Sequence, residues 1–382
     1  MSELYNRLQV LEGDTPLSPE ERLRAAVRPL LSWYGENART LPWRESPKPY
    51  SVWVSEIMLQ QTRVEAVKPY FRRFVQELPD VPALAACPEE RLLKLWEGLG
   101  YYNRVRNMQK AAVTVTERYG GILPADDRAL RELPGIGSYT AGAIASIAYG
   151  IPVPAVDGNV LRIFSRLQAD GRDMQKQSVR RSVEEELLRI LPAHAPGDFN
   201  QALMDLGASV CLPGGAPRCG ECPLSGLCRA HREGREVRYP VKREKKSRRI
   251  EERTVLLIQD GDRIALRKRP PRGLLAGLYE FPNLPGFLRE EEALEQVRGF
   301  GLTPLHIRKL EKAKHIFSHV EWHMSGYGVR VASLDSSCGG DLMLVPVEKI
   351  RTGYPVPSAF ETYANYINLR LGAEKKLPRM EK

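Results

Sequence analysis

The sequence predicts two domains: a larger all-α domain that ends in a four-cysteine loop, and a smaller α+β domain after it. Three observations support this fold class. Apolar residues recur at helical spacing from Ser18 to His231, with no competing strand pattern. Four cysteines crowd the end of that region, and alternating apolar runs begin near residue 254. A chain of 382 residues is long enough for two or three domains, each with its own core.

Changes of pattern mark the domain boundaries. The segment 232–253 holds ten basic and five acidic side chains and few apolar ones, which is typical of a solvated linker. We therefore expect five parts: an N-terminal extension over 1–17, the helical domain over 18–231, the basic linker over 232–253, the second domain over 254–372 and a C-terminal tail over 373–382.

The first predicted helix begins with a capping box. Ser18 is placed to cap it, Pro19 suits the first helical position, and Glu21 lies three residues after the cap. Further along, a second helix keeps an apolar stripe until the adjacent amides Gln60 and Gln61. Either a polar group contacts this face of the helix, or the face is exposed to solvent.

The stretch LPGIGSYTAG, residues 133–142, predicts a tight turn between two helices. Gly135 and Gly137 tolerate backbone conformations that other residues avoid. The turn would expose the first N–H groups of a helix that begins at Ser138, and such donors bind phosphate without reading base sequence. A plain turn between packed helices predicts the same pattern, so the stretch alone leaves both interpretations open.

Two carboxyl groups in the helical region suggest acid–base chemistry. Asp157 precedes a helical run and is expected to cap it, and the N–H donors of a cap lower the pKa of a carboxyl group. Glu56 lies four residues before Gln60 among apolar neighbours, which raise a carboxyl pKa. One protonated and one ionised carboxyl form the pair that cleavage of an N-glycosidic bond needs. Taken singly, each also has a structural interpretation, as a helix edge or a cap.

The clustered cysteines predict a metal centre. Intervals of seven, two and five residues separate Cys211, Cys219, Cys222 and Cys228. Structural zinc usually takes two short cysteine pairs, whereas this loop has one, so an iron–sulfur cluster is favoured over zinc. The N-terminus lacks an apolar signal core, which argues against disulfides and indicates a cytoplasmic protein.

The charge balance favours an anionic partner. Basic side chains exceed acidic ones by ten, which fits nucleic acid or an acidic membrane surface. No run of about 18 apolar residues occurs in the sequence, so we expect no membrane partner.

The second domain is predicted to contain a sheet. Two alternating runs meet at Asp260–Gly261, a strong hairpin signal, and residues 320–334 continue the strand pattern. A helix with a capping box formed by Ser358 and Glu361 is expected to close the domain.

In order along the chain, these motifs resemble those of the helix-hairpin-helix DNA glycosylases of the endonuclease III type. LPGIGSYTAG, VDGN and the four-cysteine loop carry the resemblance. Five further stretches narrow it to the adenine DNA glycosylases: LPWR, VWVSEIMLQQTRV, GLGYYNR, FNQALMDLG and HIFSHVEWHM. The resemblance spans roughly residues 20–370 and implies base excision repair of adenine mispaired with 8-oxoguanine or guanine in double-stranded DNA, by a monomer of bacterial type.

The resemblance also implies roles for individual residues. Glu56 protonates the adenine, Asp157 stabilises the cationic sugar, and Tyr139 and Asn159 hold that carboxylate and the water. Because a catalytic lysine of the bifunctional relatives is replaced here by Tyr139, no lyase step is expected. Further DNA-contacting residues are Trp43, Arg44 and Gln201 around the adenine, Gln61, Thr62, Leu99 and Tyr101 at the vacated stack, and Gly135 and Gly137 at a phosphate.

The family implies one [4Fe–4S] cluster on Cys211, Cys219, Cys222 and Cys228. The family pattern has six residues between the first two cysteines, whereas Leu212–Arg218 make seven here. We expect Gly214 and Gly215 to absorb the extra residue.

The second domain resembles a Nudix fold through the stretch GLLAGLYEFP, residues 273–282. The following REEEALEQVRGFG lacks the glutamate spacing of a magnesium-binding Nudix box, so hydrolysis there is not expected. The resemblance instead implies a reader of 8-oxoguanine, with Phe317, Ser318 and His319 in the probing loop.

Two other functions remain open at this stage. One is a pyrimidine-damage or thymine-mismatch glycosylase on the same scaffold, which Tyr139 and the additional domain disfavour. The other is a non-catalytic iron–sulfur protein that binds DNA, from which the pair Glu56 and Asp157 would distinguish an enzyme.

Overall fold

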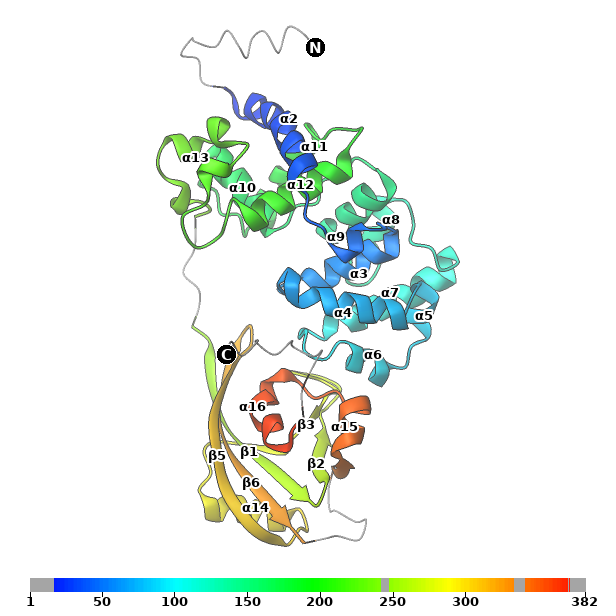
Figure 1. Cartoon of the computed structure of the whole chain (residues 1–382), viewed down its shortest axis with the longest axis vertical. Helices are drawn as coiled ribbons and strands as arrows, with labels where there is room; N and C mark the ends of the chain where they lie inside the picture. The colour runs from blue at the N-terminus through cyan, green and yellow to red at the C-terminus, as the bar shows by residue number, and fades with distance from the viewer. Residues whose placement is uncertain (1–16, 242–246, 333–340, 370, 372–382) are drawn as a thin grey trace, which may run out of the picture. The chain divides into compact units, whose positions relative to one another are not determined.

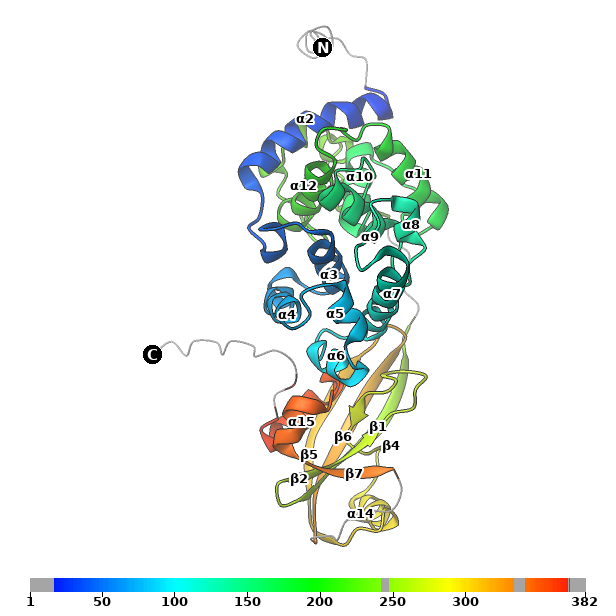
Figure 2. The same ribbon diagram turned by 90° about the vertical axis from the view of Figure 1, so that its right-hand side faces the viewer.

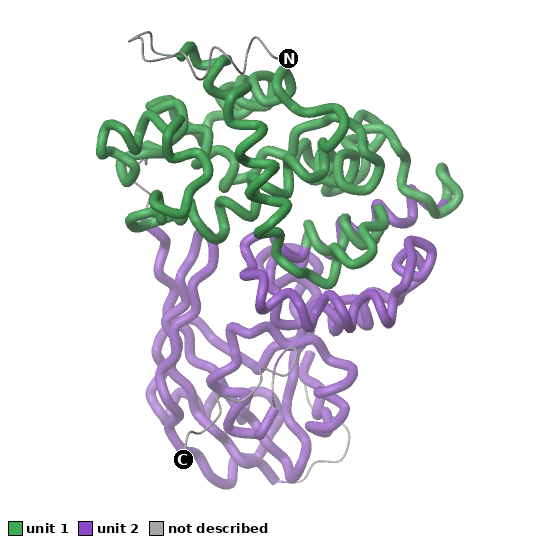
Figure 3. Tube along the Cα trace, turned by 45° about the horizontal axis from the view of Figure 1, so that its top comes forward, with its two compact units in different colours: residues 1–57, 117–244 green, residues 58–116, 245–382 purple. Residues whose placement is uncertain are grey.

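The computed structural model describes residues 17–241, 247–332, 341–369 and 371. Most of the predicted N-terminal extension, the middle of the predicted linker and the predicted C-terminal tail lie outside the described residues. The chain divides into two compact units, one formed by residues 1–57 and 117–244 and the other by 58–116 and 245–382 (Figure 3). The division passes through the predicted helical domain, so the helical segment 58–116 groups with the sheet.

The first unit is helical (Figure 1). Its elements are α2 (Pro19–Asn37), η1 (Pro42–Arg44), most of α3 (Pro49–Leu59), α8 (Asp127–Arg131), α9 (Ser138–Ala143), η2 (Ile144–Ala148), α10 (Gly158–Gln168), α11 (Gln177–Leu188), α12 (Pro196–Ser209), η3 (Cys219–Glu221), η4 (Ser225–Leu227), α13 (Arg229–Arg232) and η5 (Glu236–Arg238). The predicted capping box at Ser18 is confirmed, since its side chain accepts from the backbone of Glu21 and the Glu21 side chain bonds back.

Helices α2, α10 and α12 pack together and form the core of this unit. Leu30, Val160 and Leu206 are buried there, and the cysteine loop packs against the same cluster. Helix α10 therefore borders both the core and the cysteine loop.

The second unit begins with helices and continues with a sheet. The helices are α4 (Val64–Glu77), α5 (Val81–Ala86), α6 (Glu89–Leu95) and most of α7 (Asn103–Tyr119). The expected all-helical character of the first part of the chain is confirmed, because described residues 17–241 contain no strand.

Within the described residues, the sheet has seven strands with the central order β3-β2-β1-β6-β5. The strands are β1 (Arg249–Asp260), β2 (Arg263–Lys268), β3 (Tyr279–Glu280), β4 (Asn283–Pro285), β5 (Pro304–Ile316), β6 (Val320–Val331) and β7 (Leu342–Pro346). Strands β1 and β6 are parallel, whereas β5 and β6 form an antiparallel hairpin. One face packs on α14 (Glu290–Gly299) and the other on the short helices η6 (Ser358–Phe360) and α16 (Glu361–Ala364).

The predicted hairpin at Asp260–Gly261 is confirmed, because Asp260 pairs with Arg263 across the turn and Gly261 has φ +58°. Strand β1 begins at Arg249, inside the segment predicted as linker. The predicted capping box at Ser358 is wrong. Ser358 is the first residue of a 3₁₀ turn without a side-chain cap, and the segment breaks into short turns that pack on the sheet.

Gly326 on β6 allows the closest of these contacts. A Cβ atom built there would lie 2.3 Å from Cε1 of Tyr363, whose ring is fully buried. We expect Gly326→Ala to lower the free energy of unfolding by about 1–3 kcal/mol, because either the ring or the strand must move. Thermal denaturation checks this. Gly299→Ala, which meets nothing within 4 Å, is the control, and equal melting temperatures for the two variants would contradict the packing argument.

Candidate active site

Glu56 is a buried carboxyl group in the middle of an apolar helix. It lies on α3, where Val54 and Ile57 are also buried, and only 5% of the residue is exposed. Burial raises its pKa to about 7, and the charge of Asp157 acts in the same direction. A hydrogen bond from Tyr139 and the charge of Arg44 oppose the rise. The side chain can therefore hold a proton near neutral pH, as the sequence predicted.

Asp157 caps the next helix of the site. Its Oδ1 accepts from the backbone N–H groups of Asn159 and Val160, each at 2.8 Å, and its Oδ2 accepts from Nδ2 of Asn159 at 2.8 Å. The predicted cap of α10 is confirmed. The predicted low pKa is wrong, because burial raises the pKa of Asp157 by more than these three donors lower it.

Tyr139 connects to the acid rather than to the anion. It lies on α9, and its hydroxyl donates to Oε2 of Glu56. The sulfur of Met204 lies 4.0 Å from the same hydroxyl. The sequence resemblance had placed Tyr139 on Asp157, whereas Asp157 accepts its hydrogen bonds from Asn159 and Val160. Burial and the two carboxyl groups raise the pKa of the phenol, so it stays a donor.

Arg44 reaches the site from η1 and is held by a residue that the sequence analysis missed. Asp205 on α12 is fully buried and accepts from both terminal nitrogens of Arg44, at 2.8 and 2.9 Å. Arg39 bonds to the same carboxyl group. These two arginines hold the pKa of Asp205 below its usual value despite burial. Its position within the apolar FNQALMDLG helix was the available signal, because a buried acid there needs a cationic partner.

The other two residues predicted around the adenine, Trp43 and Gln201, lie on η1 and α12. Trp43 is buried on η1 beside Arg44, and Gln201 is partly exposed on α12, one turn before Asp205. The structure thus brings η1 and α12 together through the salt bridge from Arg44 to Asp205.

A continuous set of hydrogen bonds links Asp157 to the cysteine loop. Asn159, which binds Asp157, accepts through Oδ1 from Arg162 at 2.8 Å, and Nε of Arg162 donates to the carbonyl of Cys211 at 2.8 Å. One turn later, Arg166 lies 3.2 Å from the sulfur of Cys211. Both arginines are buried on α10, and the sequence analysis assigned them no role.

The four clustered cysteines line one pocket, together with apolar side chains such as Ile163 and Leu206. The extra residue in the loop is accommodated: Gly214 adopts φ +76°, and the N–H of Arg218 closes the loop on the carbonyl of Val210 at 2.9 Å. Burial raises the pKa of Cys219 to about 11 and that of Cys222 to about 12. Thiolates in such surroundings need a cationic partner, so the donor set fits a thiolate-bound metal centre.

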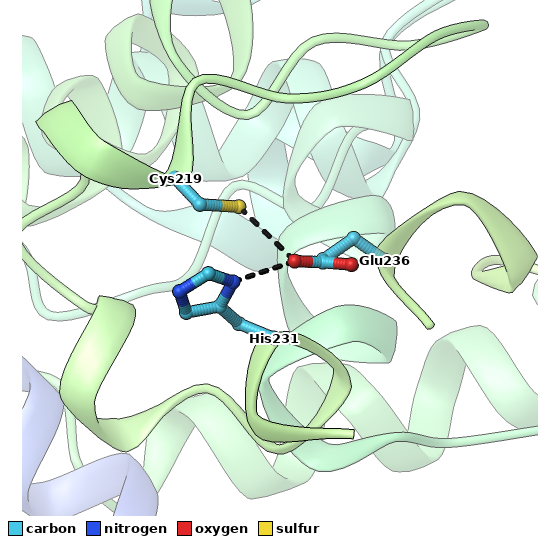
Figure 4. A group of neighbouring side chains, drawn as sticks. All are labelled: Cys219, His231 and Glu236. Carbon is cyan, nitrogen blue, oxygen red and sulfur yellow. Dashed lines mark hydrogen bonds and ion pairs between the residues drawn. The ribbon is translucent and has the colours of Figure 1, made fainter. Parts of the chain in front are cut away.

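His231 and Glu236 also line the cysteine pocket, and Figure 4 shows both side chains next to Cys219. Nδ1 of His231 lies 2.5 Å from Oε1 of Glu236, and the sulfur of Cys219 lies 3.6 Å from the same oxygen. These three side chains could hold a metal ion by geometry, but Cys219 is shared with the four-cysteine set. The pocket is therefore one site rather than two.

The glycine turn has the expected geometry. Gly135 adopts φ +78°, and Gly137 caps α9 without any side-chain hydrogen bond at the cap. A Cβ atom at Gly137 would meet nothing within 4 Å, so the approach to the start of α9 is open.

The residues predicted to fill the gap that the extruded adenine leaves in the base stack lie in the second unit. Gln61 and Tyr101 are exposed, and both have positive φ angles of 62° and 49°. Arg104 holds their two turns together, because its guanidinium donates to the carbonyls of Gln60, Leu99 and Gly100. The sequence analysis did not single out Arg104. Thr62 is partly exposed, whereas Leu99 is 6% exposed and does not project from the described surface.

The loop between β5 and β6 carries Phe317, Ser318 and His319. Phe317 packs edge-on between the rings of His315 and Trp322, at centroid distances of 4.6 and 4.9 Å. This packing leaves Ser318 and His319 exposed at the tip. The hydroxyl of Ser318 lies 3.4 Å from that of Tyr101, which is 3.3 Å from Oε1 of Gln61.

Comparisons with known proteins identify relatives of both parts of the chain. Residues 54–189 match the HhH-GPD superfamily of base excision DNA repair proteins, and residues 254–366 match the NUDIX domain family. The chain is 36% identical to the adenine DNA glycosylase of Rattus norvegicus over 80% of this chain and 72% of that protein. It is 35% identical to the adenine DNA glycosylase of Buchnera aphidicola from Acyrthosiphon pisum, over 79% and 85%.

Solved structures show the same helical fold. A thermostable thymine-DNA glycosylase matches 56% of this chain and 97% of its own, with TM-score 0.51 and 27% identity. Endonuclease III in a non-covalent DNA complex matches 57% and 98%, with TM-score 0.50 and 26% identity. Among the described residues, no helix is both long and apolar enough to cross a bilayer. Sequence similarity over most of the chain and the shared helical fold show that this chain belongs to the adenine DNA glycosylase family of base excision DNA repair.

Proposed function

We propose that this protein hydrolyses the N-glycosidic bond of adenine opposite 8-oxoguanine or guanine in duplex DNA, and that the reaction stops at the abasic site. The observation that carries the proposal is the pair of buried carboxyl groups, Glu56 bonded to Tyr139 and Asp157 bonded to Asn159. The protein acts as a monomer in the bacterial cytoplasm.

The two carboxyl groups divide the chemistry. Glu56, with a pKa of about 7, delivers a proton to the adenine ring and so makes the base a better leaving group. Asp157 faces the positive charge that develops on the sugar, and its three hydrogen-bond donors keep its oxygens oriented during the reaction. Asn159 orients both the carboxylate and the attacking water.

The flipped adenine enters a pocket bordered by Trp43, Arg44 and Gln201. Extrusion of a base costs roughly a few kcal/mol, which residues at the vacated stack must offset. The residues that fill the vacated position in the base stack are Gln61, Thr62 and Tyr101. Leu99 is buried and packs behind them. The N–H groups after Gly135 and Gly137 hold a backbone phosphate, and the excess of ten positive charges favours DNA generally.

The reaction is monofunctional because the side chain at position 139 is a phenol. A lyase step needs an amine that forms a Schiff base with the sugar, and the hydroxyl of Tyr139 is bonded to Glu56. Water is then the only nucleophile that the proposal requires.

Cys211, Cys219, Cys222 and Cys228 would hold a [4Fe–4S] cluster. The cluster supplies four iron–thiolate bonds that fix the loop without taking part in hydrolysis. Arg166 beside Cys211 and the apolar lining from α10 and α12 would stabilise its charge and exclude water.

The β5–β6 loop reads the opposite base, with Ser318 as the contact to 8-oxoguanine. The Nudix-like domain does not hydrolyse nucleotides, since Glu292 on α14 is bonded to Arg289 in a helix cap.

A purified protein should yield strand breaks from an A:8-oxoguanine duplex only after alkali. Faster excision from thymine mismatches or damaged pyrimidines would overturn the assignment.

Removing either carboxyl group should abolish excision but not binding. We expect Glu56→Gln and Asp157→Asn each to lower the single-turnover rate by two to four orders of magnitude, because a proton donor or a charge is lost, which is about the range of acid–base catalysis. Fluorescence anisotropy should show duplex affinity close to that of the wild type. Asp80→Asn, which changes the cap of α5 in the same way, is the matched control. Unchanged turnover in both site variants would end this mechanism.

The rate should depend on pH through a bell-shaped profile. Glu56 must be protonated, so the rate should fall as pH rises through about 7. Asp157 must be ionised, and because burial raises its pKa, the acid limb should begin above the usual range of an aspartate. Tyr139→Phe removes a bond that lowers the pKa of Glu56, so its basic limb should move to higher pH. A basic limb that stays in place or moves to lower pH in Tyr139→Phe would contradict the coupling.

Gly207 on α12 positions the catalytic network without touching substrate. A Cβ atom there would lie 2.6 Å from Cβ of Asn159. We expect Gly207→Ala to displace Asn159 and lower the excision rate at least tenfold, since small misplacements of catalytic groups cost about 10²-fold. Gly35→Ala, with open space around its Cβ, is the control. Wild-type rates for Gly207→Ala would show that Asn159 does not need its present position.

A further inference from the structure

A buried ion pair joins the helical segment of the second unit to the sheet domain. Lys94 is the penultimate residue of α6, and its Nζ lies 2.9 Å from Oε2 of Glu97. Their side chains are only 10% and 4% exposed. Because removing two charges from water is costly, such a pair persists only where further hydrogen bonds satisfy it.

Those hydrogen bonds come from the backbone around the end of α15 (Val347–Gly353). Nζ of Lys94 donates to the carbonyls of Ile350 at 3.0 Å and Tyr354 at 3.2 Å. Oε1 of Glu97 accepts from the N–H of Val356 at 2.8 Å. All three ammonium hydrogens of Lys94 thus have acceptors, and both carboxylate oxygens of Glu97 have donors. Figures 1 and 2 both show α6 beside α15.

Other polar contacts between the same segments are weaker. Oε1 of Glu90 accepts from Lys268 at 2.7 Å and from the hydroxyl of Tyr279 at 2.9 Å, but the Glu90 side chain is 55% exposed, and exposed pairs contribute little. Arg106 donates to the carbonyl of Ala276 at 2.7 Å, but it is a single bond to a loop. The pair Lys94–Glu97 is therefore the most buried polar link in the described junction between these segments.

This link lies close in sequence to the proposed reading site. Tyr101 follows Glu97 by four residues, and its hydroxyl is 3.4 Å from that of Ser318 at the β5–β6 tip. One long hydrogen bond between exposed side chains is too weak to keep the two segments in register. Their register must come from the buried junction.

We propose that Lys94 and Glu97 are positioning residues that set the Ser318 loop against Tyr101 and so determine the preference for 8-oxoguanine over guanine. The inference rests on the proposed function. It assigns specificity to two side chains that touch neither DNA nor the reacting bond.

The test compares single-turnover excision from A:8-oxoguanine and A:guanine duplexes. Lys94→Met and Glu97→Met should lower the A:8-oxoguanine rate about tenfold, within the range of coupling through packed networks, and change the A:guanine rate by less than about twofold. Glu97→Gln keeps the acceptor for Val356 and should retain part of the preference. The exposed pair Arg91–Glu77 provides the control, Arg91→Met with Glu77→Gln, which should leave the ratio unchanged.

Hydrogen exchange in the same variants tests the physical link without activity. Amides at 350–356 and at 317–320 should both exchange faster in Lys94→Met. A preference for 8-oxoguanine that survives in Lys94→Met, or equal losses on both duplexes with unchanged exchange at 317–320, would overturn the inference alone. If the wild-type protein shows no preference for 8-oxoguanine over guanine, both the proposed specificity and the role of Lys94 and Glu97 in it are overturned. Hydrogen exchange at 317–320 would still decide whether the buried junction holds the loop.

Discussion

Helix α10 carries the interaction on which the rest of the molecule depends. Its first turn is capped by Asp157, and its second and third turns carry Arg162 and Arg166 over the cysteine loop. The same helix buries Val160 against α2 and α12. A shift of α10 would therefore move the Asp157 carboxyl group, the core and the cysteine loop together. This arrangement connects the cysteine loop to Asp157 through a single helix.

The pKa values of the two site carboxyl groups depend on a balance between burial and hydrogen bonding. Burial raises the pKa of both Glu56 and Asp157, and hydrogen bonds oppose it in each case. Glu56 receives one such bond from Tyr139, whereas Asp157 receives three from Asn159 and Val160. Because such donors favour the charged form, hydrogen bonding in both groups works against the neutral form that burial favours. The charge of Arg44 also lowers the pKa of Glu56, and Asp205 holds the Arg44 guanidinium through a salt bridge.

The second unit uses a different principle, in which exposed reading groups are held by buried polar contacts. Gln61 and Tyr101 occupy left-handed backbone positions that few residues adopt, and Arg104 satisfies the carbonyls of both turns. At the other segment, the ring of Trp322 fixes Phe317 and leaves the tip free. Strained or exposed positions of this kind persist only where the surroundings hold them. Under the proposed function, specificity for the opposite base therefore depends on buried residues that hold these exposed groups in place.

The sequence by itself determined the fold class, the capping box at Ser18, the cap at Asp157 and the hairpin at Asp260, because each depends on residues close together in the chain. Motif order also supplied the predictions of the cysteine set and of the two carboxyl groups. Only the tertiary structure decided that burial outweighs the cap at Asp157, that Tyr139 bonds to Glu56, and that Asp205, Arg162 and Arg104 hold the site. Most of these outcomes depend on desolvation or on partners far away in the sequence, such as Tyr139 and Glu56, which are 83 residues apart. Local pattern carries no information on either quantity, which is also why the turns after Ser358 did not follow their capping signal.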